Sequence, residues 1–151
     1  MIEKTRFVTL HVPQNAQMTG NGSACAVGEA HEITIVAEFS KGDAADLTLT
    51  LQRDDAAGTG FVALANNAKI FVAANLAASD TLVRQANGVA FATGAVATAH
   101  RVVFKIDPSS LGLHTGGTNQ PCTQIRVLVA GGHADDRGTI TAQLNPIRYK
   151  G

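Results

Sequence analysis

The sequence has little charge and no excess of either sign. Its 151 residues include 12 Lys and Arg against 12 Asp and Glu, and no basic run occurs along the chain. Proteins that bind nucleic acid by neutralising phosphates concentrate Lys and Arg in a patch or stripe, so we expect no nucleic-acid partner. Charged residues make up 16% of the chain, below the usual fraction of about a quarter. Such a weakly charged surface favours partial cover by a protein partner.

The sequence also lacks a long apolar run. No stretch approaches the roughly 18 apolar residues that a membrane-spanning helix needs, and residues 1–6 are a charged segment that leads directly into strand-like sequence. We therefore expect neither a membrane segment nor a signal peptide.

Cysteine is scarce as well. Cys25 and Cys122 lie far apart in the sequence, without Cys-x-x-Cys or Cys/His ligand spacing, which indicates neither a disulfide framework nor a zinc site. We expect two reduced thiols in a protein made in the cytosol, and a single bridge between them is the alternative.

Aromatic residues are few: six Phe, one Tyr and no Trp. Sugar-binding faces built on exposed aromatic platforms, and proteins that stack single-stranded bases, both need more of them. The shortage argues against both classes.

What the sequence does contain is a period of two. Apolar and polar residues alternate in residues 32–39 and again in residues 46–53, which predicts two half-buried strands. Between them lies a turn-forming segment in which Gly42 is free to adopt positive φ and Asp43 can bond its own backbone. The pattern predicts an antiparallel hairpin.

Seven further segments have strand character, and each is bounded by Gly, Asn, Asp or Pro. They are residues 6–12, 61–64, 69–73, 81–85, 100–106, 124–130 and 139–144. This spacing of short strands predicts one all-β domain over residues 1–151, a sandwich, jelly roll or barrel. Residues 86–99 are interpreted as strand or loop, and Asp107 and Pro108 predict a short helical turn. Two long loops are expected, near residues 13–28 and 113–121.

Motifs for catalysis and metal binding are missing from the sequence. The five histidines match no metal or hydrolase signature. A carboxylate pair beside an imidazole, in His133, Asp135 and Asp136, could bind a cation or transfer protons. Because glycines flank this group, we interpret it as the tip of a hairpin between the strands at 124–130 and 139–144. Asp54 and Asp55, which precede another Gly-containing segment, are likewise predicted to lie in a turn.

Three segments, in this order, carry a family resemblance. The first is LTLTLQRDDAAGTG at 47–60, a strand followed by a turn, and the second is VVFKIDPSSL at 102–111. The third joins IRVLVA at 125–130 to TITAQLNPIRY at 139–149, which has a Pro-x-Arg-Tyr ending. Over about the last two thirds of the chain these segments resemble the head decoration, or cement, proteins of tailed bacteriophages. The loop before Cys122 is longer than in that family, and the N-terminal third has no counterpart.

The resemblance implies an antiparallel, jelly-roll-like β-sandwich of about eight to nine strands, with no catalysis, no cofactor and no metal. It also implies binding to the major capsid protein on the outer surface of the virion head, after synthesis in the bacterial cytoplasm. Self-association is expected, as a homodimer or a trimer. The function implied is reinforcement of the contacts between capsomers.

Partner contacts are expected in the long loops and at the chain ends. Cationic residues near the ends are suited to an acidic capsid surface, and polar loop residues are suited to a flat, hydrogen-bonded contact. The predicted contact residues are Lys4, Arg6, Asn15, Gln17, Asn21, His114, Asn119, Gln120, Arg148, Tyr149 and Lys150.

Two other functions remain open at this point. One is a carbohydrate- or receptor-binding β-sandwich, such as a head fibre or tail accessory module. The other is a small enzyme centred on His133, Asp135 and Asp136, which we consider the weakest hypothesis.

Overall fold

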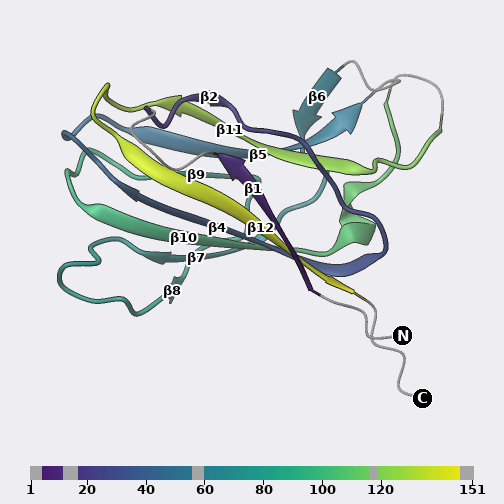
Figure 1. The fold of residues 1–151 in the computed structure, drawn as a ribbon, viewed down its shortest axis with the longest axis horizontal. Coiled ribbons are helices and arrows are strands. Elements are labelled where there is room, and N and C mark those ends of the chain that lie inside the picture. Colours follow the sequence, from purple (N-terminus) through teal and green to yellow (C-terminus); the bar gives the residue numbers. More distant parts are fainter. Residues whose placement is uncertain (1–4, 12–16, 56–59, 116–118, 147–151) are drawn as a thin grey trace.

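A computed structural model describes residues 5–11, 17–55, 60–115 and 119–146. The chain forms two antiparallel sheets that face each other as a sandwich (Figure 1). The strands are β1 (Arg6–His11), β2 (Gly20–Asn21), β3 (Cys25–Ala26), β4 (Ala30–Ser40), β5 (Leu47–Asp55), β6 (Gly60–Ala63), β7 (Lys69–Ala73), β8 (Val83–Arg84), β9 (Ala90–Ala92), β10 (Ala99–Ile106), β11 (Gln124–Gly131) and β12 (Arg137–Pro146). Among the described residues, no helix is long and apolar enough to cross a membrane.

One sheet, here called the β4 sheet, has the order β1-β12-β4-β10-β7-β8. The other, here called the β5 sheet, has the order β2-β11-β5-β6, and β3 and β9 pair with β11 and β5 outside this path. The fold class is therefore the expected all-β antiparallel sandwich.

Alternation along the strands builds the core. The inward residues of β4 and β5 are Ile33, Ile35, Ala37, Phe39, Leu47, Leu49 and Leu51, and all are buried. β10, β11 and β12 contribute buried residues in the same way, with Phe104 fully buried. Each large apolar side chain buried in this way stabilises the fold by about 1.5–3 kcal/mol.

All nine predicted strands are present, with boundaries shifted by a few residues. The three additional strands, β2, β3 and β9, have only two or three residues each. β9 lies within residues 86–99, which the sequence analysis interpreted as strand or loop, whereas β2 and β3 are too short to show the alternation and were not predicted. These two strands lie in the predicted 13–28 loop, where Met18, Cys25 and Val27 are buried. The described part of that segment therefore covers the sandwich instead of forming a free loop.

Both predicted hairpins are wrong. β4 pairs with β10 and β12, whereas β5 pairs with β6, β9 and β11, so the 41–46 turn passes from one sheet to the other. β11 and β12 are likewise in different sheets. A period of two shows which residues face the core, but strands opposite each other across a core have the same pattern as neighbours within one sheet.

The 41–46 turn differs from expectation in one further respect. Gly42 is not among the residues with positive φ. A Cβ at Gly42 would lie 2.4 Å from the Cβ of Asp135, so glycine is needed for close approach to the neighbouring turn. Asp43 behaves as predicted, because its Oδ1 accepts a hydrogen bond from Ala45 N at 2.7 Å.

The predicted helical turn is a 3-10 helix, η1 (Pro108–Leu111). Asp107 Oδ1 caps it by accepting from Ser109 N at 2.9 Å. The hydrogen bonds from the side chain and backbone of Ser109 lower the pKa of Asp107 below its ordinary value. Leu111 is buried, which anchors the start of the 112–122 loop.

Candidate functional site

A buried polar cluster lies at one end of the sandwich, beside η1 and the base of the 112–122 loop. We call Arg53, Asp54, His114 and Cys122 the Asp54 cluster. Arg53 and Asp54 come from the last residues of β5, and His114 and Cys122 come from the loop that leads into β11. Two backbone hydrogen bonds close the base of this loop, from His114 N to Gln120 O and from Cys122 N to Gly112 O, and they flank an antiparallel bridge between Leu113 and Pro121.

Asp54 is the centre of the cluster. Its Oδ1 accepts hydrogen bonds from the backbone N–H groups of Thr123 and Gln124, both at 2.8 Å. Its Oδ2 lies 2.8 Å from His114 Nε2, and the two side chains are only 6% and 8% exposed. Burial by itself would raise the pKa of Asp54, but the bonds from Gln124, His114 and Thr123 together outweigh it, so the pKa lies below its ordinary value.

Arg53 binds the backbone at the start of the 112–122 loop. Its Nη1 donates to Leu111 O at 2.5 Å and to Leu113 O at 2.8 Å, and it lies 3.2 Å from Cys122 Sγ. Gly112 lies between these two carbonyl groups, with φ +72, and a Cβ there would lie 3.3 Å from Nη1. The guanidinium therefore holds the backbone of residues 111–113 in place.

Cys122 is a buried thiol between Arg53 and Asp54. Its Sγ–H donates to Asp54 O at 3.1 Å. Burial raises the pKa of this thiol, and the nearby Asp54 and Asp55 carboxylates add to the effect, while Arg53 opposes it. Cys25 is also a free, buried thiol, as expected, and burial raises its pKa too.

Asp54, His114 and Cys122 together offer a carboxylate oxygen, an imidazole nitrogen and a sulfur atom, all within 4.8 Å of one another. The sequence analysis missed this group, because Asp54 was assigned to a turn and His114 to a surface contact. The residues are separated by 60 positions on one side and 8 on the other, a spacing that matches no ligand motif.

Of the eleven predicted contact residues, Lys4, Asn15, Arg148, Tyr149 and Lys150 lie outside the described residues. Arg6, Gln17, Asn21, Asn119 and Gln120 are exposed. His114 differs from them, because its side chain is buried against Asp54.

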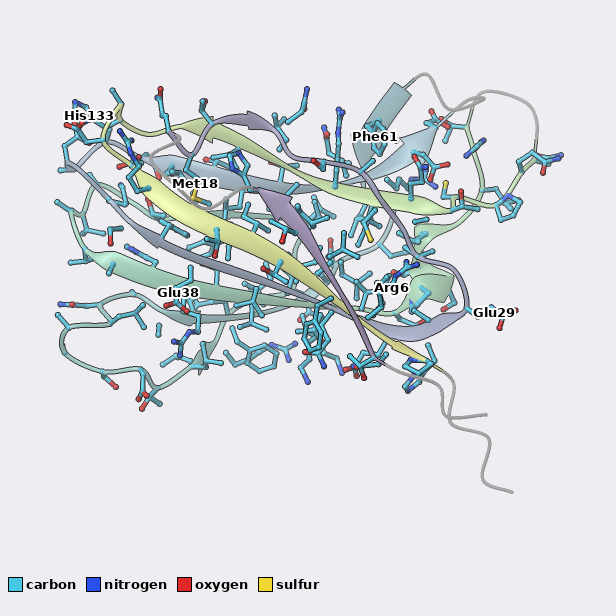
Figure 2. The ribbon with its side chains drawn as sticks, viewed as in Figure 1. Arg6, Met18, Glu29, Glu38, Phe61 and His133 are labelled. Atoms are coloured by element: carbon cyan, nitrogen blue, oxygen red, sulfur yellow. The ribbon has the colours of Figure 1, made fainter. Side chains whose placement is uncertain are left out.

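The described members of the set do not form one surface. Gln17 Nε2 donates to His133 O at 3.5 Å, and Figure 2 shows His133 at the opposite end of the sandwich from Phe61, which pairs with Asp54. Arg6 Nη2 donates to Ala26 O, so this cation is held against the loop before β4.

The third predicted group, His133, Asp135 and Asp136, lies in the turn between β11 and β12. Asp136 is fully buried. Its two oxygens accept from Gly42 N at 2.7 Å and from His133 N at 2.8 Å. The carboxylate thereby joins the two turns that connect the sheets. His133 Nδ1 lies 3.4 Å from Asp135 Oδ2, and His133 Nε2 lies 3.7 Å from Asp43 Oδ2, with all three side chains at least partly exposed.

A second feature lies on the outer face of the β4 sheet. Phe7 in β1 is 67% exposed, and it borders a shallow hollow of about 480 Å³. The other lining residues come from β4 and β12: Val36, Glu38, Thr139, Thr141 and Gln143. The hollow therefore combines one aromatic ring with several short polar side chains. The strand pattern could have identified Phe7, because it occupies an outward position in β1.

No protein-family model and no curated protein matches the sequence. Among solved structures, the fold is similar to that of the crystal structure of SPBc2 prophage-derived protein YomS. The TM-score is 0.52 and the identity is 14%, over 95% of each chain. This likeness extends over almost the whole of both chains, and at this identity it establishes a shared fold.

Proposed function

We propose that this chain is a structural protein of a tailed-phage particle, a head decoration protein that binds the outer surface of the capsid. The observation that carries the proposal is the whole-length likeness in fold to a protein of prophage origin. The three segments that resemble decoration proteins support the same function.

The outer face of the β4 sheet is the surface best suited to contact a capsid. Phe7 projects from it, and Val36, Thr139 and Thr141 around the hollow are uncharged. An exposed aromatic residue of this kind is typical of protein interfaces, in which a few aromatic side chains that become buried on binding contribute most of the binding energy. Arg6, the one predicted cationic contact residue that the structure describes, pairs with the buried Leu144 and donates to Ala26 O in β3. Its side chain therefore lies on the opposite side of β1 from Phe7.

The first test is binding of the purified protein to expanded heads of the phage that encodes it, prepared without this protein. We expect saturable binding with hundreds of copies per head, counted by quantitative peptide mass spectrometry. Binding to neither expanded heads nor precursor shells would exclude the decoration function. A dozen copies or fewer would instead indicate a vertex, neck or tail component.

The second test concerns the contact surface. Phe7→Ser should weaken head binding about 10-fold or more, equivalent to about 1.4 kcal/mol. Leu82→Ser is the matched control, because Leu82 is an exposed apolar residue that does not line the hollow. Equal effects of the two substitutions would place the contact elsewhere.

A second candidate function is binding of a glycan receptor at the same hollow. One observation favours it: Phe7 is an exposed aromatic platform beside Thr139, Gln143 and Glu38, whose side chains can bond sugar hydroxyls. A glycan array read with the native protein and with Phe7→Ser separates the two functions. Glycan binding that Phe7→Ser abolishes, with no binding to heads, would support the receptor-binding module.

A further inference from the structure

We propose that Asp54, His114 and Cys122 bind a divalent transition-metal ion of the zinc class. This inference is independent of the proposed function, and it departs from the sequence-based expectation of no metal. The three side chains place one oxygen, one nitrogen and one sulfur donor within 4.8 Å of one another at the base of the 112–122 loop.

The donor set selects the class of ion. Carboxylate, imidazole and thiolate are the three side-chain ligands of protein-bound Zn²⁺, whereas Ca²⁺ and Mg²⁺ require sites made of oxygen atoms. Three protein ligands leave the fourth tetrahedral position to water. All three residues have little exposure, so an ion here would have few competing solvent ligands.

The geometry is close to that of a metal site. Zinc–ligand bonds of about 2.0–2.3 Å in a tetrahedron place the donor atoms roughly 3.5 Å apart. His114 Nε2 and Asp54 Oδ2 are 2.8 Å apart in a hydrogen bond, so these two donors must separate by roughly 0.7 Å. The donors separated by up to 4.8 Å must approach by about 1 Å. His114 and Cys122 belong to a loop, which can make this adjustment more readily than β5.

The surroundings already supply the bonds that orient metal ligands. Thr123 N and Gln124 N hold Asp54 Oδ1, which leaves Oδ2 directed at His114. Hydrogen bonds of this kind fix ligating carboxylates in metal sites. His114 Nδ1 is buried and has no hydrogen-bond partner among the described residues. The imidazole therefore has one paired nitrogen and one spare nitrogen.

Binding requires Cys122 to lose its proton, because the thiolate is the ligand. This proton goes to solvent, and the sulfur gives up its bond to Asp54 O. His114 Nε2 also has to give up the proton that it donates to Asp54 Oδ2, and the neutral ring then carries its one proton on Nδ1. Arg53 Nη1, 3.2 Å from the sulfur, stays beside the thiolate and stabilises its negative charge. A bound ion would join the end of β5 to the 112–122 loop at three points.

Cobalt is the direct probe, because a Co²⁺–thiolate bond produces a charge-transfer band that other Co²⁺ sites lack. The full-length protein, freed of metal with a chelator, is titrated with Co²⁺ and then with Zn²⁺. We expect a thiolate band that saturates at one equivalent and disappears as Zn²⁺ displaces Co²⁺. Absence of this band in the native protein would overturn the proposal without any variant.

Two matched substitutions identify the ligand. Cys122→Ser should abolish the band and weaken Zn²⁺ binding by more than about 100-fold, since loss of even an indirect partner of a ligand costs 10–100-fold. Cys25→Ser is the control, because Cys25 is the other buried free thiol. It should leave both readouts unchanged. Persistence of the band in Cys122→Ser, or its loss in Cys25→Ser, would contradict the site. His114→Ala, with folding checked by circular dichroism, should weaken binding to a similar degree.

Discussion

Asp54 shows how one residue can organise the end of a sandwich. It accepts two backbone hydrogen bonds from the start of β11 and pairs with His114, so its buried charge is fully compensated. Removing a single partner from such an arrangement leaves another polar group unpaired in a region of low dielectric.

Asp54→Asn, in chelator-treated protein, should lower the free energy of unfolding at pH 7 by about 2–4 kcal/mol. Because the pKa of Asp54 is lower in the folded state, its contribution is complete above the unfolded pKa of about 3.9 and is lost as pH falls through the folded pKa. The difference between native protein and variant should therefore shrink below about pH 4. Urea unfolding at a series of pH values measures it. The exposed Asp80→Asn is the control, and a difference that stays constant down to low pH would contradict the assignment.

A second residue-scale prediction contrasts two phenylalanines. Phe104 is fully buried between the sheets and Phe7 is 67% exposed. Phe104→Ala should cost about 3–5 kcal/mol of unfolding free energy, because it leaves a cavity in the core. Phe7→Ala should change stability by less than about 0.5 kcal/mol. Denaturant unfolding of both variants tests the pair, and a large loss in Phe7→Ala would mean that Phe7 supports the fold and is not free for a partner.

At the scale of elements, β4 and β12 approach each other closely at Gly138. Gly138 pairs with Phe39, and a Cβ at Gly138 would lie 2.3 Å from Phe39 Cβ and 2.5 Å from Glu38 O. The start of β12 can therefore approach β4 only with glycine at this position. The β11–β12 turn, held by Asp136, depends on that approach.

Gly138→Ala should destabilise the protein by about 1–3 kcal/mol, because the strand has to move to admit a methyl group. Gly60 in β6 is the matched control: a Cβ there meets Asp55 O at 3.6 Å, an ordinary contact. Gly60→Ala should be neutral or stabilising by up to about 1 kcal/mol. Thermal unfolding of the two variants provides the comparison, and equal melting temperatures would refute the steric argument.

For the whole molecule, the notable feature is that the first and last strands are neighbours. Arg6 pairs with Leu144 across β1 and β12, and Thr5 Oγ1 bonds Asn145 Oδ1 at 3.4 Å. The ends of the described chain therefore meet at one edge of the β4 sheet (Figure 1). The pairing of β1 with β12 at this edge brings together the two ends of the sequence. Such long-range pairing is typical of slowly folding β-proteins.

A circular permutant tests this arrangement. With the natural ends joined by a flexible linker, new ends between Ala78 and Ser79 should give a folded protein, since these residues are exposed and their hydrogen bonds to Asn75 and Thr81 are local. New ends between Val36 and Ala37, in the middle of β4, should prevent folding. Circular dichroism and size-exclusion chromatography distinguish the outcomes. A folded β4 permutant would show that the central strand need not be continuous.

Much of the fold could be predicted from the sequence because burial on one face leaves a period of two. Ile33, Ile35, Leu47 and Leu49 were assigned to the core by that pattern, and all are fully buried. The Asp107 cap of η1 was predictable for a related reason, since a capping residue acts on its own neighbours. Local rules thus located strands, core and turns.

The candidate site was harder to predict from the sequence. Asp54 and Cys122 become neighbours because β5 pairs with β11, and His114 joins them through the loop before β11. A turn of Gly and Asp residues looks the same whether it closes a hairpin or crosses between sheets, so the pairing of strands was assigned wrongly. Without that pairing, no rule of spacing could bring these three residues together.

The sequence by itself determined that this protein is an all-β sandwich and which side chains face its core, because alternation along each strand is a local property. The tertiary structure alone decided which strands pair, that Asp54, His114 and Cys122 share one buried site, and that Phe7 borders a hollow together with residues of β4 and β12. Those are relations between segments far apart in the chain, and they arise when the two sheets close over a common core.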